Sequence, residues 1–156
     1  MKWILYDFKS AKESWFEEAE SAYLKKINHF INFEIQHLKT NKSDRDQAEI
    51  KIKFEENILL QKIMKDDFVI LFDEKGQSLN SIHFSSSILK ANESGKRRGV
   101  LLIGGAYGVS EAIRKKATLT LCLSSFVMNH LVAEVVVLEQ FYRAQTILNR
   151  IPYHNA

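Results

Sequence analysis

The sequence has 156 residues, 46% of them hydrophobic, which suits one domain with a packed core and excludes a disordered chain. The 22 basic residues only slightly exceed the 19 acidic ones, so the net charge of +3 does not by itself indicate nucleic-acid binding. No segment reaches the roughly 20 apolar residues of a membrane helix, and the first seven residues lack the features of a signal peptide, so we expect a cytoplasmic protein without a membrane partner.

Five apolar runs of strand length recur along the chain, separated by segments with helical spacing. The expected strands are residues 3–6, 33–38, 68–72, 100–103 and 119–123. Three of them are almost continuously apolar, which is typical of strands covered on both faces. Cys122 lies in the last strand and is expected to be buried. A single cysteine excludes an internal disulfide and a multi-cysteine zinc site, and we expect no metal. Strands that alternate with helices predict an α/β fold, a mostly parallel sheet between helix layers, and we expect one domain over residues 1–156.

Five helices are expected between and after these strands. The first begins at a capping box formed by Ser10 and Glu13. Its apolar stripe consists of Phe16, Ala19, Tyr23 and Ile27. The others cover about residues 44–64, 81–91, 111–116 and 129–148, and Ser110 is placed to cap the fourth helix. Residues 41–46 are polar throughout and predict a mobile loop.

Three glycines, at positions 104, 105 and 108, directly follow the fourth apolar strand. Glycine lets a backbone turn tightly and approach a ligand without a Cβ in the way. In an open parallel sheet, ligands bind beyond the carboxyl ends of the strands, so this loop is a candidate binding site. A plain strand-to-helix turn explains the glycines about equally well. A dinucleotide-dependent oxidoreductase is disfavoured because the spacing is not G-x-G-x-x-G, and a phosphate loop is excluded because no Gly-Lys-Ser/Thr follows.

Other residues with chemical potential leave two interpretations open. Residues 73–76, Asp-Glu-Lys-Gly, follow the third strand and suggest either a turn or an acidic group that orients a ligand. Arg143 lies on an apolar helix and needs a partner, either Glu139 one helical turn earlier or a phosphate. His130 and His154 are isolated histidines, and such residues are more often packed or solvated than catalytic.

Five segments, taken together, resemble one family. They are residues 101–108 (LLIGGAYG), residues 121–124 (LCLS), His130, residues 138–144 (LEQFYRA) and residues 152–154 (PYH). Their order and spacing over essentially the whole chain resemble the ribosomal RNA large-subunit methyltransferase H family of the SPOUT superfamily. The resemblance implies a C-terminal trefoil knot, a rare exception among folds, and a homodimer in which the partner chain completes each site.

The resemblance also implies a chemistry, the S-adenosylmethionine-dependent methylation of ring nitrogen 3 of a pseudouridine in large-subunit ribosomal RNA, free or in the assembled ribosome. By position, the residues that would contact or make room for the cofactor are Phe72, Gly104, Gly105, Leu123, Ser124, Ser125, Phe126, Val127 and Met128. The acceptor nitrogen carries a proton that must leave, so a base or a cation would help. We expect Tyr153 and His154 to hold the target base and Arg143 to contact phosphate or base.

The chain departs from the family pattern in three places. Family members usually have Thr-Phe-Pro-His where this chain has Val-Met-Asn-His at residues 127–130, and an arginine where it has Glu134. The usual basic residue after Tyr-His is replaced by Asn155. These changes weaken the positive charge expected to face RNA. They leave open an alternative function, a non-catalytic RNA- or ribosome-binding module with the same fold.

Overall fold

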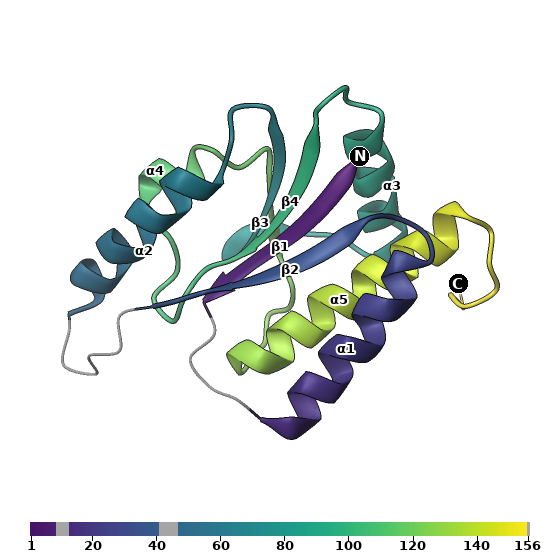
Figure 1. Ribbon diagram of the computed structural model, residues 1–156, viewed down its shortest axis with the longest axis horizontal. Coiled ribbons are helices and arrows are strands. Elements are labelled where there is room, and N and C mark those ends of the chain that lie inside the picture. The colour runs from purple at the N-terminus through teal and green to yellow at the C-terminus, as the bar shows by residue number, and fades with distance from the viewer. Residues whose placement is uncertain (9–12, 41–46, 156) are drawn as a thin grey trace.

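A computed structural model describes residues 1–8, 13–40 and 47–155 (Figure 1). The elements, in chain order, are β1 (Lys2–Phe8), α1 (Ser14–Asn28), β2 (Phe33–Leu38), α2 (Ala48–Lys62), β3 (Asp67–Ser78), α3 (Ser81–Asn92), β4 (Arg98–Ile103), α4 (Glu111–Arg114), β5 (Leu119–Cys122) and α5 (His130–Leu148). All five expected strands and all five expected helices are present. Ser10 of the expected capping box and the loop over residues 41–46 lie outside the described residues, while Glu13, its other member, precedes α1 without a side-chain capping bond. None of the described helices combines the length and apolarity that a membrane span requires.

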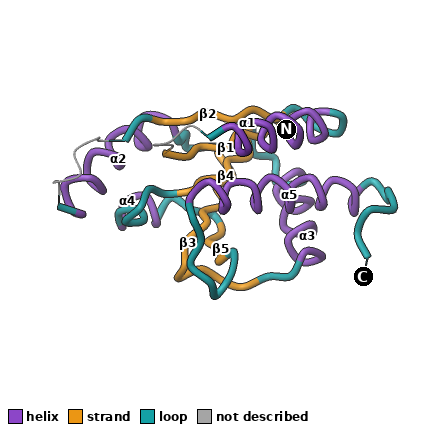
Figure 2. The backbone as a smooth tube through the Cα atoms, turned by 90° about the horizontal axis from the view of Figure 1, so that it is seen from below, coloured by secondary structure: helices purple, strands orange, loops and turns teal. Residues whose placement is uncertain are grey.

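The five strands form one sheet in the order β2-β1-β4-β3-β5, and every pair of neighbours is parallel. Successive side chains of a strand point to opposite faces, so Trp3 and Leu5 of β1 pack on α1, α3 and α5, while Ile4 and Tyr6 pack on α2 and α4. Figure 2 shows these two helix layers on either side of the strands. The predicted α/β fold is therefore confirmed.

Local sequence explains where most helices begin. The side chain of Asn80 accepts a hydrogen bond from the backbone N–H of His83 and caps α3, and Asn129 caps α5 by accepting from Leu131. Ser110 caps α4 as predicted. The stripe predicted on α1 also faces the sheet, with Phe16 and Ile27 fully buried.

Residues 73–76, for which the sequence left a turn or a ligand-orienting acid open, lie within β3, which continues to Ser78, so they are not a plain turn between two elements. A register shift between Phe72 and Gln77 lets the strand resume its pairing with β5. Gly76 makes this possible, since a Cβ there would lie 2.5 Å from the carbonyl carbon of Leu121. The glycine that suggested a turn thus allows close packing of two strands.

Helix α5 is anchored over the centre of the sheet, between α1 and α3 (Figure 1). The Trp3 ring packs edge-on against Phe141 at 5.2 Å between ring centroids. Its indole N–H donates to the side chain of Asn92 at the end of α3. Gly99 of β4 leaves room for the ring, because a Cβ there would overlap it. This contact fixes the helix that carries the family's C-terminal motifs.

Candidate active site

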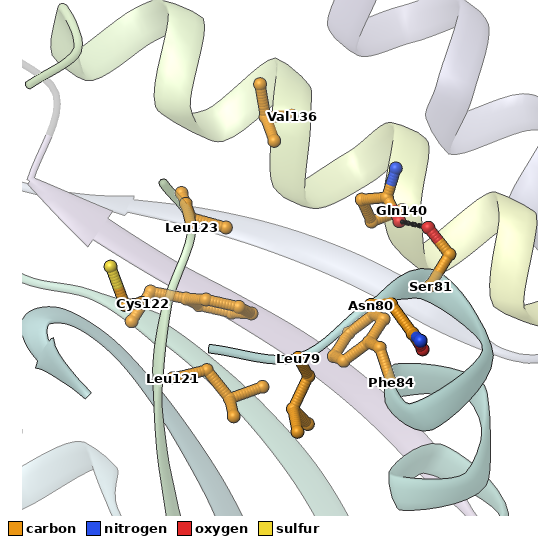
Figure 3. Close-up of a pocket in the computed structure, with 10 residues that line it drawn as sticks. Leu79, Asn80, Ser81, Phe84, Leu121, Cys122, Leu123, Val136 and Gln140 are labelled. Atoms are coloured by element: carbon orange, nitrogen blue, oxygen red, sulfur yellow. Dashed lines mark hydrogen bonds between the residues drawn. The ribbon is translucent and has the colours of Figure 1, made fainter. Parts of the chain in front are cut away.

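A cavity of ≈ 330 Å³ lies where β3, β5, α3 and α5 meet (Figure 3). Its apolar lining comes from Phe72, Leu79, Phe84, Leu121, Leu123 and Val136. Polar groups stand beside them, and the hydroxyl of Ser81 donates to Oε1 of Gln140 at 2.6 Å. Cys122 also lines the cavity and is half-buried, so the expectation that it is buried is wrong. An apolar slot with a few fixed polar groups is the usual make-up of a small-molecule site.

The glycine loop after β4 borders a second cavity, of ≈ 350 Å³. Gly104 and Gly105 line it together with Phe72, which is common to both cavities. Asp73 lines it too and forms an ion pair with Arg114, with 3.0 Å between Oδ1 and Nη1. Burial opposes ionisation of Asp73, but the hydrogen bond from Arg114 holds its pKa below the usual range. Each cavity is near the lower end of the roughly 300–1,000 Å³ that ligand sites occupy, so both together suit a ligand of nucleoside size.

The glycines also serve the packing of their own loop. A Cβ at Gly104 would lie 2.8 Å from Cγ1 of Val109, and one at Gly105 would overlap the carboxylate of Glu55. Gly108 has φ near +80°, which L side chains rarely adopt. The carboxylate of Glu55 in α2 therefore occupies the space that a side chain at position 105 would fill, and Gly105 also borders the cavity.

Glu55 gives this loop a pH-sensitive neighbour. Burial raises the pKa of its carboxyl to about 7, against hydrogen bonding by Thr40, which lowers it. A raised pKa means that the folded state is destabilised as pH rises from the ordinary value of 4.5 through 7. We expect Glu55→Gln, relative to wild type, to gain about 2 kcal/mol of unfolding free energy between pH 5 and pH 8. Urea denaturation at both pH values measures this, and Glu49→Gln, on the exposed side of α2, serves as the control; an equal gain in both variants would contradict the prediction.

The loop between β5 and α5 contains the remaining predicted cofactor residues. Leu123 lines the first cavity, but residues 124–128, all within the described chain, line neither. A turn holds the loop, in which the backbone N–H of Phe126 donates to Oγ of Ser124 at 2.9 Å. Phe126 and Val127 are 85% and 95% exposed. Adjacent exposed apolar side chains at the edge of a site favour contact with another molecule.

The three predicted catalytic residues form one cluster at the C-terminal end of α5. Arg143 binds Glu139 through Nε and Nη2, at 3.0 and 2.6 Å, which confirms the salt bridge that spacing predicted. The guanidinium lies 4.7 Å from the centre of the Tyr153 ring, and its Nη1 is 3.1 Å from Nδ1 of His154. The Tyr153 hydroxyl donates to the same carboxylate, and burial followed by this bond raises its pKa to about 12. Tyr153 is thus a hydrogen-bond donor near neutral pH, and it is not a general base.

This cluster lies away from the glycine loop within one chain. The loops after β4 and β5 lie near the beginning of α5 (Figure 1), whereas Arg143 is in the last turns of this helix and His154 follows it in the chain. His130 and Arg143 are about 20 Å apart along the helix at 1.5 Å per residue. Gln140 connects the two regions, because it accepts from Ser81 in the first cavity and donates to Glu139 in the cluster. Even so, none of the three predicted catalytic residues lines either described cavity.

A charged cluster lies at the carboxyl ends of β1 and β2, where Asp7 is buried and His37 is exposed. Asp7 and His37 are paired in register, and Nδ1 of His37 is 2.5 Å from Oδ1 of Asp7. The hydrogen bonds to Asp7 and Glu20 raise the pKa of His37 to about 9. Burial opposes ionisation of Asp7, but the nearby His130 imidazole and the hydrogen bond with His37 hold its pKa well below the usual range.

Glu134, on the first turns of α5, belongs to the same cluster. The residue is fully buried, and burial together with the nearby Asp7 raises its pKa far above the usual range. Glu134 therefore does not lie on the surface, and the expectation that it directly weakens the charge facing RNA is wrong. Sequence reasoning missed Asp7 and His37 entirely. The sequence did contain a signal: Asp7 and His37 are polar residues near the ends of two apolar strands, and these strands are neighbours in the sheet.

Comparison with known proteins defines the class. A family model described as "Predicted SPOUT methyltransferase" matches residues 1–154, so the chain belongs to the SPOUT methyltransferases. A solved SpoU methyltransferase, AviRb from Streptomyces viridochromogenes in complex with AdoMet, aligns with a TM-score of 0.47 and 14% identity over 93% of this chain and 60% of that one.

Curated relatives define the family within this class. The chain is 50% identical to the ribosomal RNA large subunit methyltransferase H of Bdellovibrio bacteriovorus over 99% of both chains. It is 34% identical to the protein of the same name from Parabacteroides distasonis over 90% of both. The chain belongs to the ribosomal RNA large subunit methyltransferase H family, as the sequence motifs predicted.

Proposed function

We propose that this protein transfers a methyl group from S-adenosylmethionine to ring nitrogen 3 of a pseudouridine in large-subunit ribosomal RNA. The observation that carries the proposal is the match to curated methyltransferases of that name along 99% of both chains. The geometry supports it, because the carboxyl ends of β3, β4 and β5 border two cavities that share Phe72.

The lining of the cavities fits the proposed cofactor. The apolar slot between Leu121, Leu123 and Phe72 suits an adenine ring, and Ser81 with Gln140 offers hydrogen-bonding groups for a ribose. When bound, S-adenosylmethionine supplies an electrophilic methyl group on a sulfonium. In-line displacement at that carbon needs little more from the protein than positioning of the two reactants.

The C-terminal cluster is proposed to hold the target base. Glu139 fixes the guanidinium of Arg143 from one side, and the ring of Tyr153 covers one face of it. Nη1 of Arg143 lies beside His154. The positive charge of the guanidinium is therefore held near the proposed position of the target base, which gains negative charge as it loses its proton. His154 is proposed to contact the base itself, because its Nδ1 lies beside Nη1 of Arg143.

We further propose a homodimer in which one chain's cofactor cavities face the partner's C-terminal cluster. Two observations support it: the cluster lies outside the cavities of its own chain, and Phe126 and Val127 are exposed at the edge of the site. We also propose that residues 123–128 belong to the cofactor site and that a trefoil knot surrounds it. The whole chain is proposed to form one domain and to be located in the cytoplasm, where ribosomes are.

The proposal is tested with ribosomes from cells that lack the gene. Purified protein and S-adenosylmethionine are expected to restore one methylpseudouridine, detected by mass mapping of the large-subunit RNA. Calorimetry with S-adenosylmethionine separates an enzyme from a non-catalytic module. Ribosome binding without cofactor binding or methylation would support the module and overturn the proposal.

His154→Ala is expected to slow single-turnover methylation at saturating ribosomes about 100-fold, because it removes a group from the base-holding cluster. Cofactor affinity should not change, since His154 lines neither cavity. The matched control is His83→Ala, an exposed histidine on α3. An unchanged rate in His154→Ala would remove this residue from the mechanism.

A further inference from the structure

The cluster at the ends of β1 and β2 contains the donor atoms of a metal site. Asp7, His37 and Glu134 each offer one nitrogen or oxygen atom, and these three atoms lie within 4.8 Å of one another. Nδ1 of His37 is 2.5 Å from Oδ1 of Asp7 and 3.7 Å from Oε1 of Glu134. Side-chain shifts of under about 1 Å would bring three such atoms to the 2.0–2.2 Å that zinc requires.

Glu134 provides an independent sign that something is bound here. Its side chain is fully buried and points into the cluster, yet neither of its oxygens has a hydrogen-bond partner. Oδ2 of Asp7 is also buried and unpartnered. Buried carboxylate oxygens without partners are costly, and a cation is one of the few ligands that satisfies several at once.

The surroundings resemble the outer shell of a metal site. A histidine that binds a metal through one ring nitrogen usually donates the other N–H to a carboxylate. His37 meets this condition, because its Nε2 is 2.8 Å from Oε2 of Glu20 while its Nδ1 faces Asp7. Nε2 of His130, buried and without a hydrogen-bond partner, is 3.6 Å from Oδ2 of Asp7, so a second imidazole lies next to the three donors.

We propose that Asp7, His37 and Glu134 bind one divalent transition-metal ion, zinc by preference, with His130 as the fourth donor. Mixed imidazole and carboxylate donors in small number suit zinc, whereas calcium and magnesium prefer more oxygen ligands and retained water. The single cysteine excluded only thiolate sites, so sequence reasoning looked for the wrong ligands. The ion would join β1, β2 and the first turns of α5. Glu134, which stands where family members usually have arginine, would then be a metal ligand.

Zinc titration of the untagged, full-length protein tests this proposal without measuring methylation. After treatment with EDTA and dialysis, calorimetry with zinc chloride should give one equivalent per chain with a Kd of about 1 μM or tighter, and elemental analysis should confirm the ratio. Zinc should also raise the melting temperature of the wild type. Glu134→Gln and His37→Gln should each weaken binding about 100-fold, and Glu20→Gln about 10-fold.

The matched control is His83→Gln, which removes an exposed histidine from α3 and should leave zinc affinity unchanged. Glutamine is close in size to protonated glutamate, so Glu134→Gln should fold, and its melting curve without zinc verifies this. Wild-type protein that binds no zinc, or variants that bind it as tightly as wild type, would overturn the proposal. The cluster would then be a set of ion pairs in which Glu134 keeps a proton.

Discussion

A heterodimer of two inactive variants is expected to recover about half of the wild-type methylation rate, because each of its chains supplies the half-site that the other lacks. One variant, Leu123→Arg, places a positive charge in the first cavity and should not bind the cofactor. The other, His154→Ala, lacks the C-terminal group. In the heterodimer, the intact cavity of the second chain would meet the intact His154 of the first.

The two chains are co-expressed with different affinity tags, and the heterodimer is purified through both. The reciprocal control pairs the double variant Leu123→Arg/His154→Ala with wild type. Under the proposed arrangement this heterodimer is inactive, because the one working cavity faces the chain without His154. If each chain completed its own site, the control would retain about half the activity and the first heterodimer none. The two preparations therefore give opposite results under the two arrangements.

The order of elements was predictable because apolar periodicity reflects burial directly. Residues 33–38 form β2 within the predicted bounds, and α5 begins at His130 because Asn129 caps it. A turn was one of the two interpretations of residues 73–76, because Asp and Gly favour turns locally. These residues instead form the register shift between Phe72 and Gln77, after which β3 pairs with β5 again and Gly76 fits against Leu121. Which strands are neighbours cannot be read from local preference.

The same limit explains which parts of the site were predictable. The Glu139–Arg143 pair follows from helical spacing and was anticipated as one of two options. Asp7 and His37 are 30 positions apart and become partners only because β1 pairs with β2 in one register. The separation of the C-terminal cluster from the glycine loop depends on the direction in which α5 runs over the sheet. Motif order identified the family but carried no such distances.

Trp3→Ala is expected to cost about 3–5 kcal/mol of unfolding free energy, the range for removing a large buried aromatic side chain. Trp3 is fully buried, packs on Phe141 of α5 and donates to Asn92 of α3. Its removal leaves a cavity at the point where α5 rests on the sheet, and Gly99 provides no side chain to fill it.

The matched control is Trp15→Ala, since Trp15 is 45% exposed on α1 and its indole N–H donates to Glu13, two residues earlier in the chain. That substitution should cost under about 1 kcal/mol. Urea denaturation of both variants gives the difference, with the m-value reporting any change in compactness. Because Trp3 positions the helix that joins the cavities to the C-terminal cluster, Trp3→Ala should also slow methylation at temperatures where the variant remains folded. Equal stability losses in the two variants would show that α5 is held by other contacts.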